Sequence, residues 1–171
     1  SPSSAGPHRP HRLELVYVRA LLGTDGDKFA GFRAHLPSAA VAHPIMFDDD
    51  DQVLARVREL ALALPDADEK VSHGRPAFFT KKVFAYYGGS VRVDGEWVAH
   101  DRAIIFVPDP DDVRALGEDP RVWVPAYLGA YGWLGLDLDG VDDWDEVAEL
   151  LDASYRQTAP KRSIARLDEQ H

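Results

Sequence analysis

The sequence predicts an α+β fold: an antiparallel β-sheet with N- and C-terminal helices packed on one face. Apolar residues recur at helical spacing near residues 53–64 and again near 144–155. Between these segments, short runs alternate apolar and polar residues and are separated by turn residues. Strands grouped between flanking helices are typical of an α+β domain, whereas a doubly wound α/β fold would alternate the two.

The first 45 residues are expected to be a poorly patterned appendage to a domain at 46–171. They hold four of the seven His and five of the twelve Pro. The stretch SPSSAGPHRPH has the low apolar content typical of disorder, and RLELVYVRALLG is compatible with a strand or a short helix. The alternative is an ordinary N-terminal element that packs on the domain.

The first helix is predicted within DDDDQVLARVRELALALPDADE. Its apolar face consists of Val53, Leu54, Val57, Leu60, Ala61 and Leu64. The four Asp residues at 48–51 supply an N-cap and favourable charge at the positive end of the helix dipole. Pro65 is expected to stop the helix. An Asp run can also suggest a metal site, but consecutive Asp residues do not converge on one ion as alternating loop ligands do.

A β-rich stretch follows the first helix. AFFTKKVFAYY is predicted to be a strand that ends in a turn at Gly88-Gly89, and RAIIFVP a short apolar strand. Asp94-Gly95 lies between alternating residues and indicates a two-residue hairpin, because a type I′ turn needs positive φ at both central residues. RVWVPAYLGAYGWLGLDLDG predicts two more strands around a Gly/Tyr loop.

Two further helices complete the domain. DPDDVRALGEDP predicts a short helix that begins at Asp109 or Asp111. DDWDEVAELLDASYRQTAPKR predicts the last helix, where Asp143 and Glu146 resemble a capping box. The apolar stripe of the last helix consists of Trp144, Val147, Ala148, Leu151 and Tyr155.

Charge and composition restrict the classes of partner and site. Residues 1–45 carry five basic and three acidic residues, net +2, and residues 46–171 carry 14 basic and 26 acidic residues, net −12. The far field of the domain therefore repels nucleic acid and anionic membranes, while a local basic patch can still act within the screening length of about 8 Å. The absence of Cys excludes disulfides, thiolate nucleophiles and Cys-ligated zinc.

The chain is expected to be cytoplasmic. No apolar run approaches the ~20 residues that span a membrane. The N-terminus lacks the basic, apolar and small-residue order of a signal peptide. No Gly-rich phosphate-binding loop follows a predicted strand.

Short motifs, taken in order, resemble the MmcQ/YjbR family over about residues 53–162. The residues that carry the resemblance are Leu64, Pro65, Ser72, Gly74, Pro76, Phe78, Phe84, Ala85, Gly132, Trp133, Leu138, Asp139, Ser154, Tyr155, Ala159, Pro160, Lys161 and Arg162. The resemblance implies a small CyaY-like α+β fold, in agreement with the elements predicted above. Members are commonly described as DNA-binding, in connection with a double-wing arrangement of hairpins. The resemblance brings with it no catalytic residue.

The loop before the predicted sheet is the first candidate site. His73 and Arg75 flank Gly74 and could offer an imidazole and a guanidinium to an anionic ligand, because the Arg fork suits phosphate and carboxylate. The alternative is a plain turn in which Gly74 adopts an unusual φ and Arg75 pairs with a nearby acid such as Asp68 or Glu69.

The cations of the hairpins are the second candidate site. These are Lys81, Lys82, Arg92 and Arg102, with Lys161, Arg162 and Arg166 in a basic C-terminal tail. Tyr86, Tyr87 and Trp97 could stack on bases, each worth ~1–3 kcal/mol. Alternatively, the strand lysines protect exposed edges from aggregation and most of the aromatic side chains belong to the core. The hypothesis requires the cations to share one solvent face.

Other combinations of residues could form a pocket or a catalytic site. Tyr127, Tyr131 and Trp133 either rim a pocket or anchor their loop on the core. Asp137 and Asp139 could suggest a metal or hydrolase site, but no His is close to them in sequence. His100 and Asp101 are expected at a hairpin turn. An enzyme is not expected.

An unrecognised enzyme would need a pocket that brings His73 or His100 within hydrogen-bond reach of a carboxylate. The Gly-x-Ser-x-Gly motif of an α/β-hydrolase nucleophile is absent.

The sequence therefore predicts a non-catalytic protein without metal or cofactor that binds DNA weakly and in a salt-sensitive way. The predicted contact residues are His73, Arg75, Lys81, Lys82, Arg92, Arg102, Trp133, Lys161 and Arg162. The alternative is a protein- or small-ligand-binding module whose acidic surface faces a basic partner. Neither function involves a membrane.

Overall fold

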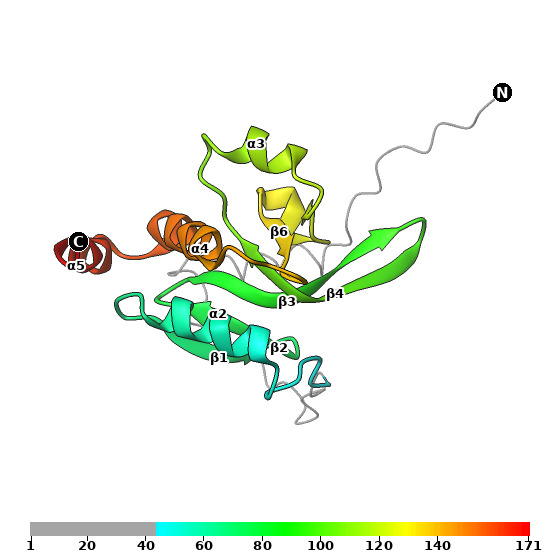
Figure 1. The fold of residues 1–171 in the computed structure, drawn as a ribbon, viewed down its shortest axis with the longest axis horizontal. Coiled ribbons are helices and arrows are strands. Elements are labelled where there is room, and N and C mark those ends of the chain that lie inside the picture. Colours follow the sequence, from blue (N-terminus) through cyan, green and yellow to red (C-terminus); the bar gives the residue numbers. More distant parts are fainter. Residues whose placement is uncertain (1–43) are drawn as a thin grey trace, which may run out of the picture. The chain divides into compact units, whose positions relative to one another are not determined.

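A six-stranded antiparallel sheet is the central element of the computed structural model, which describes residues 44–171 (Figure 1). The predicted appendage at 1–45 thus lies outside the described residues, apart from its last two. The strand order is β1-β2-β3-β4-β6-β5. The strands are β1 Asp68–Ser72, β2 Arg75–Phe79, β3 Val83–Val93, β4 Glu96–Phe106, β5 Val122–Trp123 and β6 Leu134–Asp137.

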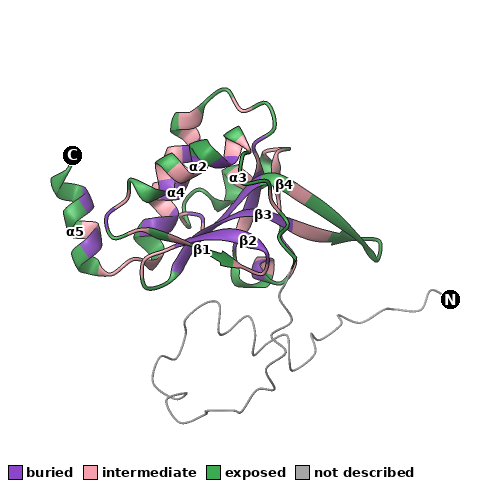
Figure 2. Ribbon diagram, turned by 90° about the horizontal axis from the view of Figure 1, so that it is seen from below, coloured by how far each residue is buried: buried purple, intermediate pink, exposed green. Residues whose placement is uncertain are grey.

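Helices cover one face of this sheet, which confirms the predicted α+β class (Figure 2). The core is formed between strands β2, β3, β4 and β6 and the helices α2 and α4, with Leu167 of α5 added to it. The helices are α2 Gln52–Leu62, α3 Val113–Glu118, α4 Trp144–Thr158 and α5 Lys161–Glu169, with a 3-10 turn η1 at Leu128–Tyr131. No helix among these described residues has the length and apolar character needed to cross a bilayer.

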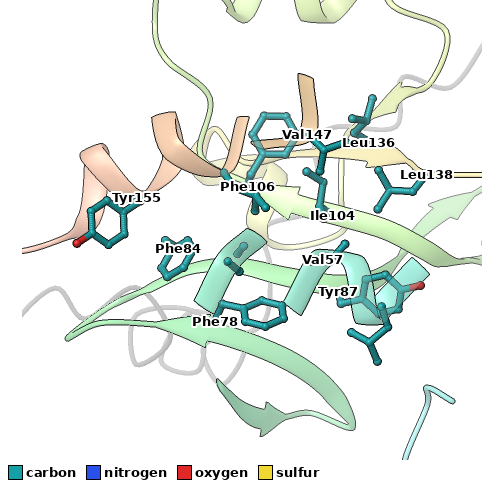
Figure 3. Packing of buried hydrophobic residues seen from close by; sticks show 14 of the residues in the cluster. Val57, Phe78, Phe84, Tyr87, Ile104, Phe106, Leu136, Leu138, Val147 and Tyr155 are labelled. Carbon is teal, nitrogen blue, oxygen red and sulfur yellow. The ribbon is translucent and has the colours of Figure 1, made fainter. Parts of the chain in front are cut away.

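The side chains of the core interlock between sheet and helices (Figure 3). Phe84 of β3 meets Tyr155 of α4 edge to face, with ring centroids 5.6 Å apart. The Tyr155 hydroxyl donates to the carbonyl of Pro65 at 2.7 Å, so this buried polar group is satisfied. Ser154, also buried, donates to the Phe84 carbonyl and accepts from Val107 N–H. Helix α4 is thereby attached to both β3 and the segment after β4.

The predicted N-caps of the two long helices are confirmed. Asp51 begins α2 and accepts from Val53 N–H at 3.0 Å. Asp143 begins α4 and accepts from the N–H groups of Asp145 and Glu146. The capping box is only half formed, because the Glu146 side chain binds Arg121 instead, at 2.8 Å.

Some predicted boundaries differ from the structure. The short helix α3 begins after Asp112, not after Asp109 or Asp111, because Asp109 instead accepts from Asp111 N–H in the preceding turn. Residues 161–169, predicted to be a basic tail, form helix α5, which is anchored by the buried Ser163 and Leu167. Pro160 ends α4 and allows the new helix to begin, since proline suits the start of a helix.

Strand β1 was not predicted, because its sequence DEKVS lacks an apolar alternation. It is an exposed edge strand paired with β2 from Asp68↔Phe79 to Ser72↔Arg75. His73 and Gly74 are the two-residue turn between these strands, with φ of 55° and 79°. The predicted unusual φ of Gly74 is thus confirmed, while ligand binding by this loop stays a prediction.

The predicted turn at Gly88-Gly89 is wrong, because β3 runs straight through both glycines to Val93. Tyr87 pairs with Ile104 and Gly89 pairs with His100, so Gly88 alone faces the three residues 101–103 of β4. This is a β-bulge with its extra residues in β4, and opposite them Gly88 adopts a φ of 76° that favours glycine. Glycine marks bulges as well as turns, so the sequence alone did not separate the two.

The bulge divides the β3–β4 hairpin into two parts. The part next to the helices is buried, and the part beyond the bulge, residues 89–100, extends past the body of the sheet and is largely exposed (Figures 1 and 2). We call residues 89–100 the arm. Its tip is the predicted turn at Asp94-Gly95, with φ of 51° and 82°.

Replacing Gly88 by Ala should destabilise the fold more than replacing Gly95 by Ala. Both glycines have positive φ, which costs an L-residue about 1–2 kcal/mol. A Cβ at Gly95 meets no atom within 4 Å, whereas a Cβ at Gly88 would lie 2.3 Å from Nη1 of the buried Arg75. We expect a loss of about 1 kcal/mol for Gly95→Ala and about 3 kcal/mol for Gly88→Ala in urea unfolding. Equal losses would contradict the close approach of Arg75.

Candidate binding surface

The predicted contact cations do not share one face. Lys81 and Lys82 lie in the turn between β2 and β3, whereas Arg92 lies near the far end of β3. Lys82 and Arg92 are ten positions apart along an extended strand, which corresponds to roughly 30 Å. The condition set for the hairpin-face hypothesis, that the cations lie together, is therefore not met by these side chains.

Arg75 is turned into the protein. Its guanidinium is buried, with Nη2 3.2 Å from Asp101 Oδ1 and Nη1 3.4 Å from the Met46 carbonyl. The expected partner Glu69 binds Arg58 instead, at 2.7 Å. Gly88 makes room for the guanidinium, since a Cβ there would collide with it. In this arrangement Arg75 connects β2 to the bulge in β4 and is not offered to a ligand.

Arg102 is neutralised by two carboxylates. Its Nε lies 3.3 Å from Asp51 Oδ2 and its Nη1 3.8 Å from Asp139 Oδ1. The same Oδ2 accepts from the Tyr87 hydroxyl at 2.7 Å. Asp51 therefore caps α2 with one oxygen and binds the sheet with the other. Burial raises the pKa of Asp51, but hydrogen bonds from Tyr87 and Val53 N–H together with Arg102 outweigh it and hold the pKa below its usual value.

Three more candidate residues lie apart from the arm. Lys161 and Arg162 are exposed at the start of α5. His73 lies in the β1–β2 turn, where burial lowers its pKa.

Trp133, like Arg75, lies in the interior. Its side chain is buried against Tyr86, with ring centroids 5.7 Å apart. Burial also raises the pKa of Tyr86 to about 12. Trp133 therefore anchors its loop on the sheet, as the alternative interpretation of these aromatics had it.

The exposed aromatic side chains gather at the arm. Trp97 and Tyr127 are about half exposed, at 52% and 47%, and their rings lie 6.1 Å apart. The Arg92 guanidinium lies over the Trp97 ring at 5.5 Å from its centroid. Ala126 N–H donates to the Ser90 carbonyl at 3.0 Å and so attaches the loop at 124–131 to the arm. We define the arm patch as Trp97, Val124, Tyr127 and Tyr131, all of them exposed; Val93 and Val98 are exposed on the opposite face of the hairpin.

The backbone at Tyr127 is unusual. Its φ of 64° and ψ of −61° place it in the γ-turn that L-residues rarely adopt, and Leu128 N–H closes the turn on the Ala126 carbonyl at 2.8 Å. This turn lies directly beside the contact with Ser90. The tight turn therefore places the Tyr127 ring against Trp97.

A stacked pair holds the base of the arm. The His100 ring lies on the Trp123 ring with centroids 4.1 Å apart and an interplanar angle of 18°. Asp137 Oδ1 lies 2.7 Å from His100 Nδ1 and accepts from Trp123 Nε1 at 3.0 Å. The Trp123 ring crosses Gly135, where a Cβ would lie 2.4 Å from it. This contact links β4, β5 and β6 just below the arm.

Sequence reasoning missed this cluster. It placed His100 in a turn, but His100 lies within β4, and it found no His near Asp137 because the two residues are 37 positions apart. His100 thus lies within hydrogen-bond distance of a carboxylate, as an enzyme that used it would require. The carboxylate oxygen is shared with Trp123, which favours a positional role. Within the described part of the chain, no group of three or more His, Cys, Asp or Glu side chains is arranged to hold a metal ion.

Comparison with known proteins assigns the family. The YjbR family model matches residues 62–157, more than half of the chain. The chain belongs to the YjbR family. The matched region includes the arm, the loop at 124–131 and nearly all of α4, while most of α2 and all of α5 lie outside it. No curated protein matches the chain.

The variant Asp51→Asn should have a lower free energy of unfolding than the natural protein at neutral pH, and this difference should disappear in acid. The depressed pKa of Asp51 means that its carboxylate stabilises the fold above the unfolded value near 4, and that this contribution disappears as pH falls through the folded pKa. We expect a loss of about 1–3 kcal/mol in unfolding free energy at pH 7.

The matched control for this measurement is Asp50→Asn, in the same Asp run but outside the contacts to Tyr87 and Arg102. Its unfolding free energy should stay close to that of the natural protein. A deficit for Asp51→Asn that is unchanged between pH 7 and pH 3 would contradict the role assigned to the carboxylate.

Proposed function

We propose that this YjbR-family chain is a non-catalytic protein-binding module that docks its partner on the arm patch. The observation that carries the proposal is the exposed pair of Trp97 and Tyr127 with Arg92 lying over Trp97. Large aromatic side chains and Arg dominate the energetics of protein interfaces, because they bury much area and lose little side-chain entropy. Four exposed large apolar side chains of the arm patch lie on two adjacent segments, whereas single scattered apolar side chains on a surface are normal.

The charge around the arm supports a protein partner over a polyanion. The loop at 124–133 contains no charged residue, and the tip of the arm carries Asp94 and Glu96. Arg75 and Arg102 are both engaged by carboxylates. A nucleic acid needs cations at its phosphates, and the patch offers it only Arg92 among the described residues of the arm. A partner with a basic, partly apolar surface fits better.

DNA binding remains a second candidate function, at a different place. Lys81 and Lys82 lie just before Phe84, and the Phe84 ring contacts Tyr155 near the end of α4. Helix α5, which carries Lys161 and Arg162, begins shortly after α4 ends. These cations are Lys81, Lys82, Lys161 and Arg162, and none of the four forms an ion pair within residues 44–171. We call them the end cations. They are the local basic group that the domain offers to a duplex.

The arm-patch proposal predicts a specific cross-link. A photoreactive phenylalanine analogue in place of Tyr127 should form a discrete protein adduct in the host cell, and the same analogue in place of Glu149 on the exposed side of α4 should not. The adduct should survive nuclease treatment. For the purified partner, Trp97→Ser should weaken binding about 30-fold or more, as expected for an aromatic anchor worth 2 kcal/mol.

Two results would count against the proposal. One is an equal yield of adduct from both positions. The other is unchanged affinity in Trp97→Ser, with Lys81→Glu as the matched surface control that should leave affinity unaltered.

The DNA candidate is tested by titrating a 20-bp duplex at several salt concentrations. If the end cations contact phosphates, log K should fall with log salt with a slope of at most about 3.6, which is 0.9 for each of four contacts. Charge reversal of Lys81 and Lys82 together should remove about half of that slope. Absence of binding at low salt, or a slope untouched by the reversal, eliminates this second function.

A further inference from the structure

The outer edge of the arm on β4 has no neighbouring strand. Strand β4 pairs with β6 only from Ala103↔Asp137 to Phe106↔Leu134, so the described residues offer no strand beside Glu96–Asp101. An unpaired edge is a template for adding another strand, and proteins usually protect it by covering it, by charges or by proline. Here the edge is flanked by the exposed side chains of Trp97 and Val98.

The register of the hairpin shows which backbone groups point outward. In a hairpin closed by a two-residue turn, the flanking pair Val93↔Glu96 is hydrogen-bonded, and bonded and non-bonded pairs then alternate. Arg92↔Trp97 and Ser90↔Ala99 are therefore non-bonded pairs. The N–H and C=O groups of Trp97 and Ala99 point away from β3, toward the open edge.

The opposite edge confirms this alternation and is already occupied. The carbonyl of Ser90 points outward from β3, and Ala126 N–H donates to it at 3.0 Å. The loop at 124–131 therefore covers the β3 edge of the arm with one of its own backbone groups. The β4 edge has the same arrangement of outward groups without such a cover among the described residues.

The charges beside the open edge select its occupant. Asp94 and Glu96 are exposed at its start, and Arg92 lies over Trp97. Asp101 at its end is paired with Arg75. The domain behind them carries a net charge of −12 over residues 46–171. A second copy of this chain would bring the same negative charge to the edge, whereas an extended basic segment would complement it.

We propose that the partner docks by adding an extended, positively charged segment as a strand on the β4 edge of the arm, bonded to Trp97 and Ala99. This rests on the proposed function and names how the arm patch is used. Backbone hydrogen bonds supply the affinity, and successive side chains of the added strand lie against Trp97 on one face and Val98 on the other.

The test uses the whole chain and an acetylated, amidated peptide of alternating Lys and Val, eight residues long. Amide hydrogen exchange is followed by NMR at Trp97 and Ala99, with Val98 as internal reference because its N–H already bonds across to Val91. At a peptide concentration ten times Kd, exchange at Trp97 and Ala99 should slow about tenfold. A peptide of alternating Glu and Val should leave all three amides unchanged.

A pair of variants tests the strand geometry. Ala99→Pro removes one outward N–H at a position where an edge strand tolerates proline, and should abolish the protection of Trp97. Ala99→Thr keeps the N–H and should retain the protection of the Trp97 amide. If Ala99→Pro fails to fold, the comparison of the two peptides on the natural chain decides the matter alone.

Three outcomes would overturn the proposal. Peptide-induced shifts of the Trp97 and Tyr127 side chains with both amides still exchanging fast would exclude strand addition and leave the arm patch as the docking surface. Protection that grows with protein concentration without peptide would make a second copy the occupant. Failure of the Lys-Val peptide to perturb the arm, with the cross-linked partner still dependent on Trp97, would remove the basic segment while the proposed function stands.

Discussion

The bulge at Gly88 is the constraint on which the rest of the structure depends. Gly88 alone faces three residues of β4, and it leaves room for the buried guanidinium of Arg75 to reach Asp101 across the bulge. Without the bulge, β3 and β4 would continue as one regular hairpin whose side chains alternate between the two faces of the sheet. With it, the same two strands supply five of the fifteen residues of the core cluster and then project an exposed arm. The candidate binding surface is therefore a product of a backbone irregularity near the middle of the sheet.

The arginines of the domain act mainly as internal connectors. Arg75 joins β2 to the bulge, and Arg121 joins the start of β5 to α4 through Glu146. Arg166 joins α5 to the segment after α2 through Asp66. Arginine suits this role because its planar fork binds carboxylates in fixed geometry. As a result, most arginines of the described residues are paired with carboxylates, and the exposed apolar side chains of the arm are the most distinctive outward feature of the domain.

The parts of the fold that depend on local sequence were predictable. The helices after Asp51 and Asp143 follow from caps and helical periodicity, and the hairpin at Asp94-Gly95 follows from turn chemistry. Strand β1 was missed because an edge strand needs no apolar alternation, and the bulge was read as a turn because glycine serves both. The candidate site was harder still. The pairing of His100 with Asp137, and of Trp97 with Tyr127, depends on strand register and loop path across 30 or more positions, which periodicity does not report.

The γ-turn at Tyr127 has an implication for how this domain can change over evolutionary time. A residue held in such a backbone conformation reduces stability by about 1–3 kcal/mol, and glycine would remove most of that strain. Selection for thermal robustness alone would therefore favour losing the ring, while selection for its contact with Trp97 would favour keeping it. The two pressures act on the same codon in opposite directions, so this position is a natural place to measure the trade-off between robustness and recognition.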